Sequence, residues 1–239
     1  AYKAGLLERS FAHFQSHATS DQVRAFQRYC RAQASWLDDF GLFMALKQHF
    51  EGAVWNTWPS DIATREPEAM AHWSQRLQEP IDRKRYEQYL FYTQWKALKA
   101  EVNALDIEII GDIPIFCAYD SADVWANPSL FHLDERGNPT HVAGVPPDYF
   151  SPTGQLWGNP LYRWDRMAAR GFEWWIARFR MMLDLVDIVR LDHFRGLQAY
   201  WEVPADAETA INGRWVEGPG IALFDAYDRD GAAVSQLMS

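Results

Sequence analysis

The sequence has little cysteine, no long apolar run and no internal repeat, and each absence excludes a class of protein. Its two cysteines, Cys30 and Cys117, are too few for a disulfide framework or a metal-ligand cluster. No apolar run reaches the roughly 18 residues that span a bilayer, and residues 1–9 lack the apolar core of a signal peptide. We therefore expect a protein of the reducing cytoplasm that binds no metal and no membrane.

Positive charge is also scarce. The chain has 23 lysines and arginines against 32 aspartates and glutamates, which gives a net charge of -9 at pH 7. A partner with a phosphate backbone needs a positive surface, so this balance argues against nucleic acid. Apolar side chains are plentiful instead, because 48% of the residues are hydrophobic and 15% are aromatic, enough to fill a sizeable core.

The first zone of the chain, residues 1–105, is predicted to be a helical subdomain. Ser20 or Asp21 can cap a helix whose apolar side chains recur at mostly helical spacing as far as Phe40. Residues 83–105 repeat this pattern. Between the two helical patterns, residues 55–59 are predicted to form a turn-like connection, with Trp55 and Trp58 packing under a loop.

The second zone, residues 106–239, changes to short apolar runs. A strand is predicted over residues 107–114, and a long irregular loop over residues 117–163 holds six of the chain's twelve prolines. A helical stripe over residues 172–186 leads directly into another strand over residues 186–192. Strand, long loop, helix and strand make a βαβ unit, so the zone predicts an α/β fold, as part of a (β/α)8 barrel.

The second of these strands carries charge at its C-terminal end. Side chains alternate between the two faces of a strand, so Val189 and Leu191 share one face while Arg190 and Asp192 share the other. Catalytic groups of a (β/α)8 barrel sit at the C-terminal ends of its strands, which makes Asp192 a candidate nucleophile with Arg190 as its electrostatic partner. A structural ion pair at a strand end is the competing interpretation.

The long loop gathers residues suited to sugar. Its residues 146–160 read PPDYFSPTGQLWGNP and place Asp148, Gln155 and Trp157 close together in sequence. The C–H face of a sugar ring stacks on an indole, and its hydroxyl groups pair with carboxylate and amide groups. Each residue alone is more often a turn or packing residue, but their concentration on one loop beside acid-tipped strands favours a sugar site.

Six runs of residues together resemble one enzyme family. They are GDIPIF at 111–116, DSADVW at 120–125, VAGVPPDYF at 142–150, GQLWGNP at 154–160, DIVRLDHFRG at 187–196 and GRWVEGPG at 213–220. The chain, from residue 1 to about residue 224, resembles 4-alpha-glucanotransferase (amylomaltase, disproportionating enzyme) of the alpha-amylase clan.

The resemblance implies a retaining transfer of α-1,4-glucan segments between maltooligosaccharides, without a metal or an organic cofactor. It implies that Asp192 is the nucleophile that forms a covalent glucosyl-enzyme intermediate, and that Arg190 keeps its carboxylate ionised and oriented. It implies that His193 and Asp112 contact sugar hydroxyl groups near the point of cleavage. It also implies that the loop residues Asp148, Gln155 and Trp157 bind the neighbouring glucose units.

The sequence departs from the family in its later residues. The family's acid/base glutamate, in a run Ala-Glu-Asp-Leu-Gly, and its stabilising aspartate, in a His-Asp pair, are both missing. Asp225, Asp228 and Asp230 are expected on a solvated helix face or linker rather than as substitutes. We therefore expect an internal fragment that does not turn over glucan alone. A non-catalytic glucan-binding module and an α-glucan hydrolase of the same clan remain alternatives.

Overall fold

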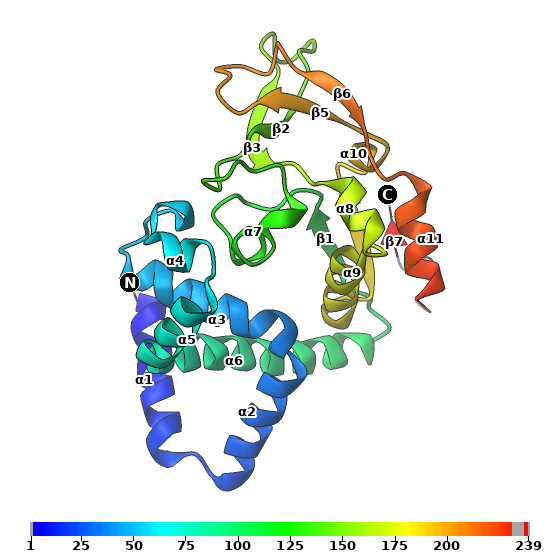
Figure 1. The fold of residues 1–239 in the computed structure, drawn as a ribbon. Helices are drawn as coiled ribbons and strands as arrows, with labels where there is room; N and C mark the ends of the chain where they lie inside the picture. Colours follow the sequence, from blue (N-terminus) through cyan, green and yellow to red (C-terminus); the bar gives the residue numbers. More distant parts are fainter. Residues whose placement is uncertain (1, 231–236, 239) are drawn as a thin grey trace. The chain divides into compact units, whose positions relative to one another are not determined.

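A computed structural model describes residues 2–230 and 237–238 and divides the chain into two compact units, Ala1–Leu98 and Lys99–Ser239 (Figure 1). The division falls inside the long helix α6 (Gln78–Asn103), whereas the sequence pattern places it at about Leu105. The two units are described in turn.

The first unit consists of helices among its described residues, as the apolar spacing predicts. They are α1 (Tyr2–His17), α2 (Ser20–Ala32), α3 (Ala34–His49), η1 (Trp55–Thr57), α4 (Ser60–Ala63), α5 (Pro67–Arg76) and the greater part of α6 (Gln78–Asn103).

The prediction for the start and length of the second helix was wrong in two details. Its N-cap is Thr19, not Ser20 or Asp21: the Thr19 hydroxyl accepts a hydrogen bond from the backbone N–H of Gln22, whose side chain accepts one from the backbone N–H of Thr19. The helix also ends at Gln33, where φ is −104° and ψ is 8°, and α3 begins immediately afterwards. The spacing of apolar residues alone does not predict a break of one residue, such as that at Gln33 between α2 and α3.

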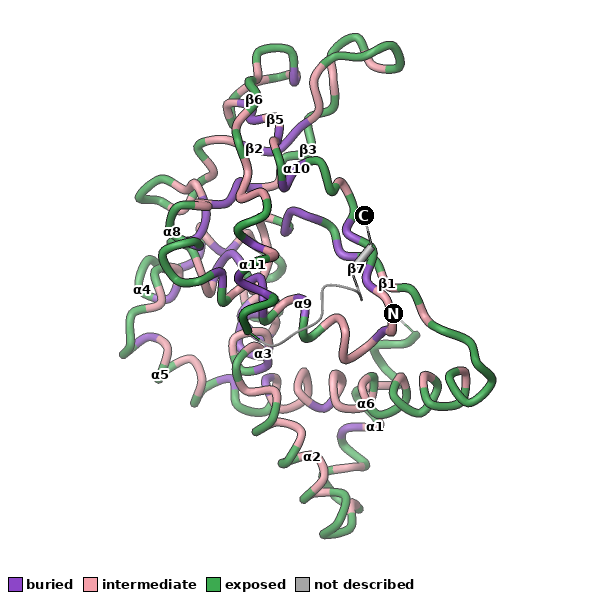
Figure 2. Tube along the Cα trace, turned by 90° about the vertical axis from the view of Figure 1, so that its right-hand side faces the viewer, coloured by how far each residue is buried: buried purple, intermediate pink, exposed green. Residues whose placement is uncertain are grey.

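The core of the first unit lies around α3. Leu37, Leu46 and Ile62 are completely buried, and Trp55 and Trp58 pack beneath the connection that carries them. In contrast, α2 has no buried residue and α1 has only one, so in Figure 2 both are coloured mainly as exposed and intermediate.

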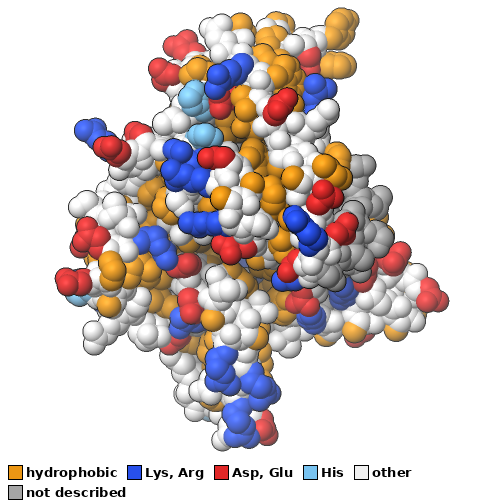
Figure 3. Space-filling view, turned by 45° about the vertical axis from the view of Figure 1, so that its right-hand side comes forward, with side chains coloured by type: hydrophobic (Ala, Val, Ile, Leu, Met, Phe, Trp, Pro, Cys, Tyr) orange, Lys and Arg blue, Asp and Glu red, His pale blue; other side chains and the backbone are white. Residues whose placement is uncertain are grey.

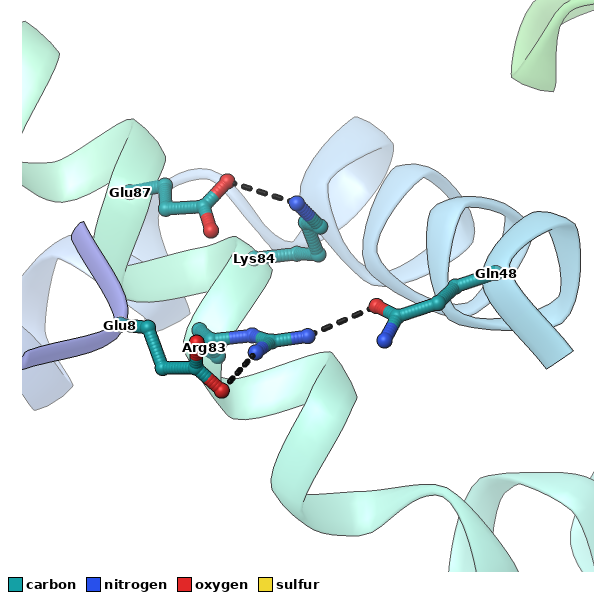
Figure 4. A network of polar contacts seen from close by, with 5 residues as sticks. All are labelled: Glu8, Gln48, Arg83, Lys84 and Glu87. Atoms are coloured by element: carbon teal, nitrogen blue, oxygen red, sulfur yellow. Dashed lines mark hydrogen bonds and ion pairs between the residues drawn. The ribbon is translucent and has the colours of Figure 1, made fainter. Parts of the chain in front are cut away.

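Polar contacts centred on Arg83 join three helices of this unit (Figure 4). The guanidinium of Arg83, on α6, donates to Glu8 Oε1 on α1 at 3.3 Å and to Gln48 Oε1 on α3 at 2.7 Å. Next to it, Lys84 donates to Glu87 Oε2 at 2.8 Å within α6. Arg83 therefore ties the α1 and α3 surfaces to one point on α6.

The second unit mixes strands with helices. Its elements in chain order are β1 (Ile110–Pro114), α7 (Ala122–Ala126), η2 (Pro128–Leu130), β2 (His141–Val145), β3 (Gln155–Pro160), α8 (Trp164–Ala169), α9 (Glu173–Leu185), β4 (Ile188–Asp192), α10 (Arg195–Gln198), β5 (Ala199–Pro204), β6 (Arg214–Glu217), α11 (Ile221–Arg229) and β7 (Leu237–Met238).

One sheet of this unit is parallel, with strand order β1-β4-β7. Helix α9 packs against β1 and β4, and α11 packs against α9 (Figure 1). Each pair of neighbouring strands is therefore connected through a covering helix, as in a βαβ unit. This arrangement confirms the predicted α/β class and fits part of a (β/α)8 barrel. The sequence pattern revealed only two of these strands, and β7 is a third.

The prediction of an irregular loop over residues 117–163 was wrong. That stretch contains α7, η2, β2 and β3, and the two strands join β5 and β6 in an antiparallel sheet of order β3-β2-β5-β6. Strand β2 does not show the alternation of buried and exposed residues that predicts a strand, because Val142, Ala143 and Gly144 are buried in succession. Gly144 is required there, since a Cβ atom would lie 2.6 Å from the carbonyl oxygen of Gln155 on β3.

The second sheet is built from the excursions that follow the C-terminal ends of β1 and β4. The first excursion supplies β2 and β3, and the second supplies β5 and β6. Active sites of barrel enzymes are built from such segments. Strand β1 itself begins at Ile110 rather than at residue 107.

Helix α11 carries Asp225 and Asp228, and Asp230 follows as its C-cap residue. Asp225, Asp228 and Asp230 are all exposed there, which confirms the predicted solvated helix face, while Leu223 and Tyr227 on the same segment are buried. None of the helices over residues 2–230 combines the length and apolar character needed to cross a membrane.

Candidate active site

The centre of the site is a guanidinium held between two carboxylates. In the parallel register of β1 and β4, Asp112 lies opposite Arg190, and Pro114 lies opposite Asp192. Arg190 donates from Nη1 to Asp112 Oδ2 at 2.8 Å and from Nη2 to Asp192 Oδ1 at 2.6 Å. All three side chains are about half exposed. The two strands thus present two carboxylates to solvent at a fixed relative position.

The alternation predicted for β4 explains this placement. Val189 and Leu191 are buried on one face, whereas Arg190 and Asp192 are exposed on the other. Ion pairs with this exposure contribute about 0–1 kcal/mol to stability. These ion pairs therefore add little to the stability of the fold. A functional role explains the three charged side chains better than a purely structural ion pair does.

His193 and Trp157 form the second part of the site. His193 follows Asp192 with φ of 53°, in the left-handed region that non-glycine residues rarely adopt. Its ring meets the edge of the Trp157 indole, with centroids 4.8 Å apart and planes at 79°. Trp157 in turn donates from Nε1 to Gln155 Oε1 at 3.0 Å. Side-chain contacts therefore connect Gln155 to Trp157 and Trp157 to His193, which follows Asp192 in the chain.

The surroundings of the His193 imidazole lower its pKa and so favour its neutral form. Burial lowers its pKa below the usual 6.5, and Arg195 lowers it further, while the carboxylate of Asp192 acts in the opposite direction. A neutral ring offers one N–H donor and one nitrogen acceptor, which suits a contact with sugar hydroxyl groups.

Asp148 makes its hydrogen bonds within its own turn. Its Oδ1 accepts from the backbone N–H groups of Phe150 at 2.9 Å and Ser151 at 2.8 Å, so the side chain shapes the loop. The turn presents Tyr149 and Phe150 to solvent, at 95% and 91% exposure. Figure 3 shows hydrophobic side chains exposed at the top of the molecule, where the loops of the four-stranded sheet lie in Figure 1.

Sequence reasoning missed several residues that surround this site. The almost complete exposure of Tyr149 and Phe150 is visible only in the structure. Arg195, whose guanidinium lies 4.4 Å from the centroid of Trp215, sits beyond His193 in the sequence, and the run HFRG carries no periodic signal that would mark it. Across the part of the chain that the structure describes, no group of His, Cys, Asp and Glu side chains is arranged to hold a metal ion.

The arrangement suits chemistry on a polyhydroxylated substrate. A half-exposed carboxylate fixed by a guanidinium can attack an electrophilic carbon, while the second carboxylate and a neutral imidazole can accept and donate hydrogen bonds to hydroxyl groups. The indole of Trp157, 37% exposed, and the rings of Tyr149 and Phe150 offer apolar surface for stacking.

Comparisons with known proteins show the family to which the chain belongs. The sequence profile of the 4-alpha-glucanotransferase family matches residues 1–237. The chain is 52% identical over 224 residues to 4-alpha-glucanotransferase of Thermus thermophilus, covering 94% of this chain and 45% of that protein. It is 49% identical over 230 residues to the Synechocystis enzyme of the same name, covering 96% of this chain and 46% of that protein.

Solved structures give the same result for the fold. An amylomaltase from Streptococcus agalactiae, solved in complex with acarbose, superposes with a TM-score of 0.91 at 39% identity, over 98% of this chain and 46% of the other. Amylomaltase from Corynebacterium glutamicum superposes with a TM-score of 0.72 at 22% identity, over 94% of this chain and 29% of the other, which supports the fold alone. The chain thus spans a little under half the length of the curated relatives named here.

Proposed function

The chain belongs to the 4-alpha-glucanotransferase family, and on that premise we propose that the protein containing it transfers α-1,4-glucan segments between maltooligosaccharides. The observation that carries the proposal is the bridge from Arg190 to both Asp112 and Asp192 at the end of two parallel strands. A glucan as substrate is supported by the related amylomaltase from Streptococcus agalactiae, which was solved in complex with acarbose.

In this proposal Asp192 is the nucleophile. Its carboxylate attacks the anomeric carbon of the donor glucan, the glycosidic bond to the leaving segment breaks, and a glucosyl ester forms. A second glucan's hydroxyl group then attacks the same carbon and releases Asp192, which restores the original configuration. Arg190 serves this step by donating from Nη2 to Asp192 Oδ1 at 2.6 Å, which fixes the orientation of the carboxylate.

The substrate lies, in this proposal, along the aromatic side chains of the β2–β3 region. Trp157 stacks against one glucose unit, with His193 and Gln155 holding the indole in place. Tyr149 and Phe150, which are almost fully exposed, offer apolar surface to further glucose units. Asp112 accepts hydrogen bonds from sugar hydroxyl groups, and Asp148 acts by shaping the turn.

Transfer also needs a proton donor for the leaving oxygen. Retaining glycosidases use a second carboxyl group about 5–5.5 Å from the nucleophile. The Asp112 carboxylate already accepts a hydrogen bond from Arg190 Nη1, so in this proposal it binds sugar and is not the proton donor. We propose that the acid/base residue is supplied from outside the residues described here, and that the chain alone does not turn over glucan.

The experiment is a product analysis with maltotriose. The protein containing this chain should convert two maltotriose molecules into glucose and maltopentaose, because transfer conserves the number of glycosidic bonds. Glucose and maltose without longer products would instead identify a hydrolase. Binding of maltoheptaose with neither product, by a protein that also contains an acid/base carboxylate, would identify a glucan-binding module.

We also propose that the protein works in a reducing compartment, the cytoplasm. Cys30 and Cys117 are both free thiols, and Cys117 is buried against Tyr162. Cell fractionation with an antibody against the chain tests this location.

A further inference from the structure

Arg178, on the inner side of α9, reaches the C-terminal end of β1. Its Nη2 donates to the carbonyl oxygen of Pro114 at 2.7 Å, and its Nη1 lies 3.3 Å from the carbonyl oxygen of Ile115. The guanidinium is stacked on two indoles, with its central carbon 4.8 Å from the Trp175 centroid and 5.5 Å from the Trp174 centroid. A cation fixed in this way has little freedom to move away from the two carbonyl groups.

Tyr162 also donates to this backbone segment. It is completely buried, and its hydroxyl donates to the carbonyl oxygen of Ile115 at 2.8 Å. Arg178 Nη1 lies 3.4 Å from that hydroxyl oxygen, so the guanidinium, the phenol and the carbonyl form one connected set. Asn159 extends it by donating to the carbonyl oxygen of Cys117 at 2.9 Å.

The segment held by these donors lies between the two halves of the candidate active site. Pro114 is the register partner of Asp192 and follows Asp112 by two residues. Phe116, next in the chain after Ile115, has its ring centroid 6.4 Å from that of Trp157 and 5.9 Å from that of Tyr162. Movement of residues 114–116 would therefore disturb both the carboxylate pair and the indole.

We propose that Arg178 and Tyr162 are positioning residues for the glucan site. They fix the backbone at residues 114–116, which sets the position of Asp112 relative to Asp192 and supports the ring of Trp157 through Phe116. Neither side chain touches the substrate. The proposal rests on the proposed function, since it assigns these residues to the binding of a glucan chain.

The hydrogen bonds of Arg178 and Tyr162 to the backbone distinguish a positioning role from ordinary side-chain packing. Pro114 is the last residue of β1, and its carbonyl group points to α9, where Arg178 supplies the N–H that satisfies it. Two charged-donor contacts and one phenol on adjacent carbonyl groups fix a direction as well as a position. Arg180, two residues later on the same helix, is exposed and pairs with Asp230, so it serves as a matched control.

The experiment follows the indole N–H signal of Trp157 by NMR, assigned with Trp157→Phe, in the chain and its variants, without and with maltoheptaose. Arg178→Met should shift the Trp157 signal without sugar and weaken maltoheptaose binding about tenfold, since two donors to the segment are lost. Arg178→Lys, which keeps one donor, should restore part of both effects. Arg180→Met should change neither.

Tyr162→Phe provides a second test if Arg178→Met does not fold. It removes one hydroxyl group and keeps the ring, and it should displace the Trp157 signal in the same direction by a smaller amount. A Trp157 signal and an affinity that stay at the wild-type values in both folded variants would overturn the positioning role. Failure of the unsubstituted chain to respond to maltoheptaose would contradict the proposed function, while the sugar-free spectra still decide whether Arg178 positions Trp157.

Discussion

Arg190 of β4 lies directly opposite Asp112 of β1, and its guanidinium joins that carboxylate to the carboxylate of Asp192 two residues along its own strand. The two carboxylates face the same side because strand residues two apart share a face. The planar fork of a guanidinium can serve both at once. An ammonium group is a single point charge on a flexible stem and cannot reproduce this bridge.

In the protein that contains this chain, Arg190→Lys should therefore lower transfer activity by more than about tenfold, although the positive charge is retained. The melting temperature should change little, because a half-exposed ion pair contributes about 0–1 kcal/mol. Initial rates with maltotriose, together with a thermal unfolding curve, measure the two effects. Full activity in the lysine variant would show that charge alone is sufficient, against the bridging role.

His193 should titrate below pH 6.5 in the folded chain, because burial and Arg195 both favour its neutral form. NMR of its ring protons over a pH series measures the midpoint. Between the folded and the unfolded pKa the unfolded state binds more protons, so the free energy of unfolding should fall as the pH drops below 6.5.

Two variants should shift the His193 titration in opposite directions. Asp192→Asn removes the charge that favours the protonated ring and should lower the pKa further, whereas Arg195→Met removes an opposing charge and should raise it. Equal midpoints in the two variants would mean that His193 does not sense Asp192, which contradicts the closeness of the two groups.

Gly196→Ala should distort the candidate active site by crowding the side chains of Ile115 and His193. A Cβ atom at this position would lie 2.8 Å from Ile115 Cδ1 and 2.9 Å from His193 Cδ2. Overpacking of this kind typically costs about 1–3 kcal/mol, and the His193 ring would have to move away from Trp157. Urea unfolding and the Trp157 indole signal measure the two effects.

Gly5→Ala is the control for that substitution. A Cβ atom at Gly5 meets no atom within 4 Å, and the residue lies inside α1. Alanine there should stabilise the helix by about 0.5–1 kcal/mol. If both variants were destabilised equally, the crowding around Gly196 would not be the cause.

Trp157→Ala should weaken substrate binding more than it slows chemistry, because the indole stacks on a sugar and does not touch the reacting bond. In the protein that contains this chain, KM for maltotriose should rise while kcat changes less. Isothermal titration calorimetry with maltoheptaose measures the change in the dissociation constant directly. An unchanged KM would indicate that Trp157 is a packing residue of β3.

Some of this site could be predicted from the sequence, because local periodicity carries the information. The buried and exposed alternation of β4 placed Arg190 and Asp192 on one face, and the structure agrees. The bridge to Asp112 could not be predicted from spacing, since it depends on the parallel register of two strands far apart in the chain. The family resemblance named Asp112 without that geometry.

Other features depend on tertiary contacts that no local pattern records. Strand β2 shows no period-2 alternation, since three of its residues are buried in succession, and it joins a second sheet by pairing with β3 and β5. Arg178 looks like an ordinary charged residue on an amphipathic helix. Its role appears only when the carbonyl groups of Pro114 and Ile115 are seen to lie within its reach.

The most direct test of the central claim, that Asp192 is the nucleophile, is covalent labelling of the chain with a 5-fluoro-α-glucosyl fluoride. Fluoride leaves without protonation, so attack by the carboxylate breaks the C–F bond and forms a glucosyl ester even without an acid/base residue. Mass spectrometry of peptides should find one glucosyl group on Asp192 and none in Asp192→Asn. An absent adduct, an adduct on another residue, or one that persists in Asp192→Asn would contradict the account.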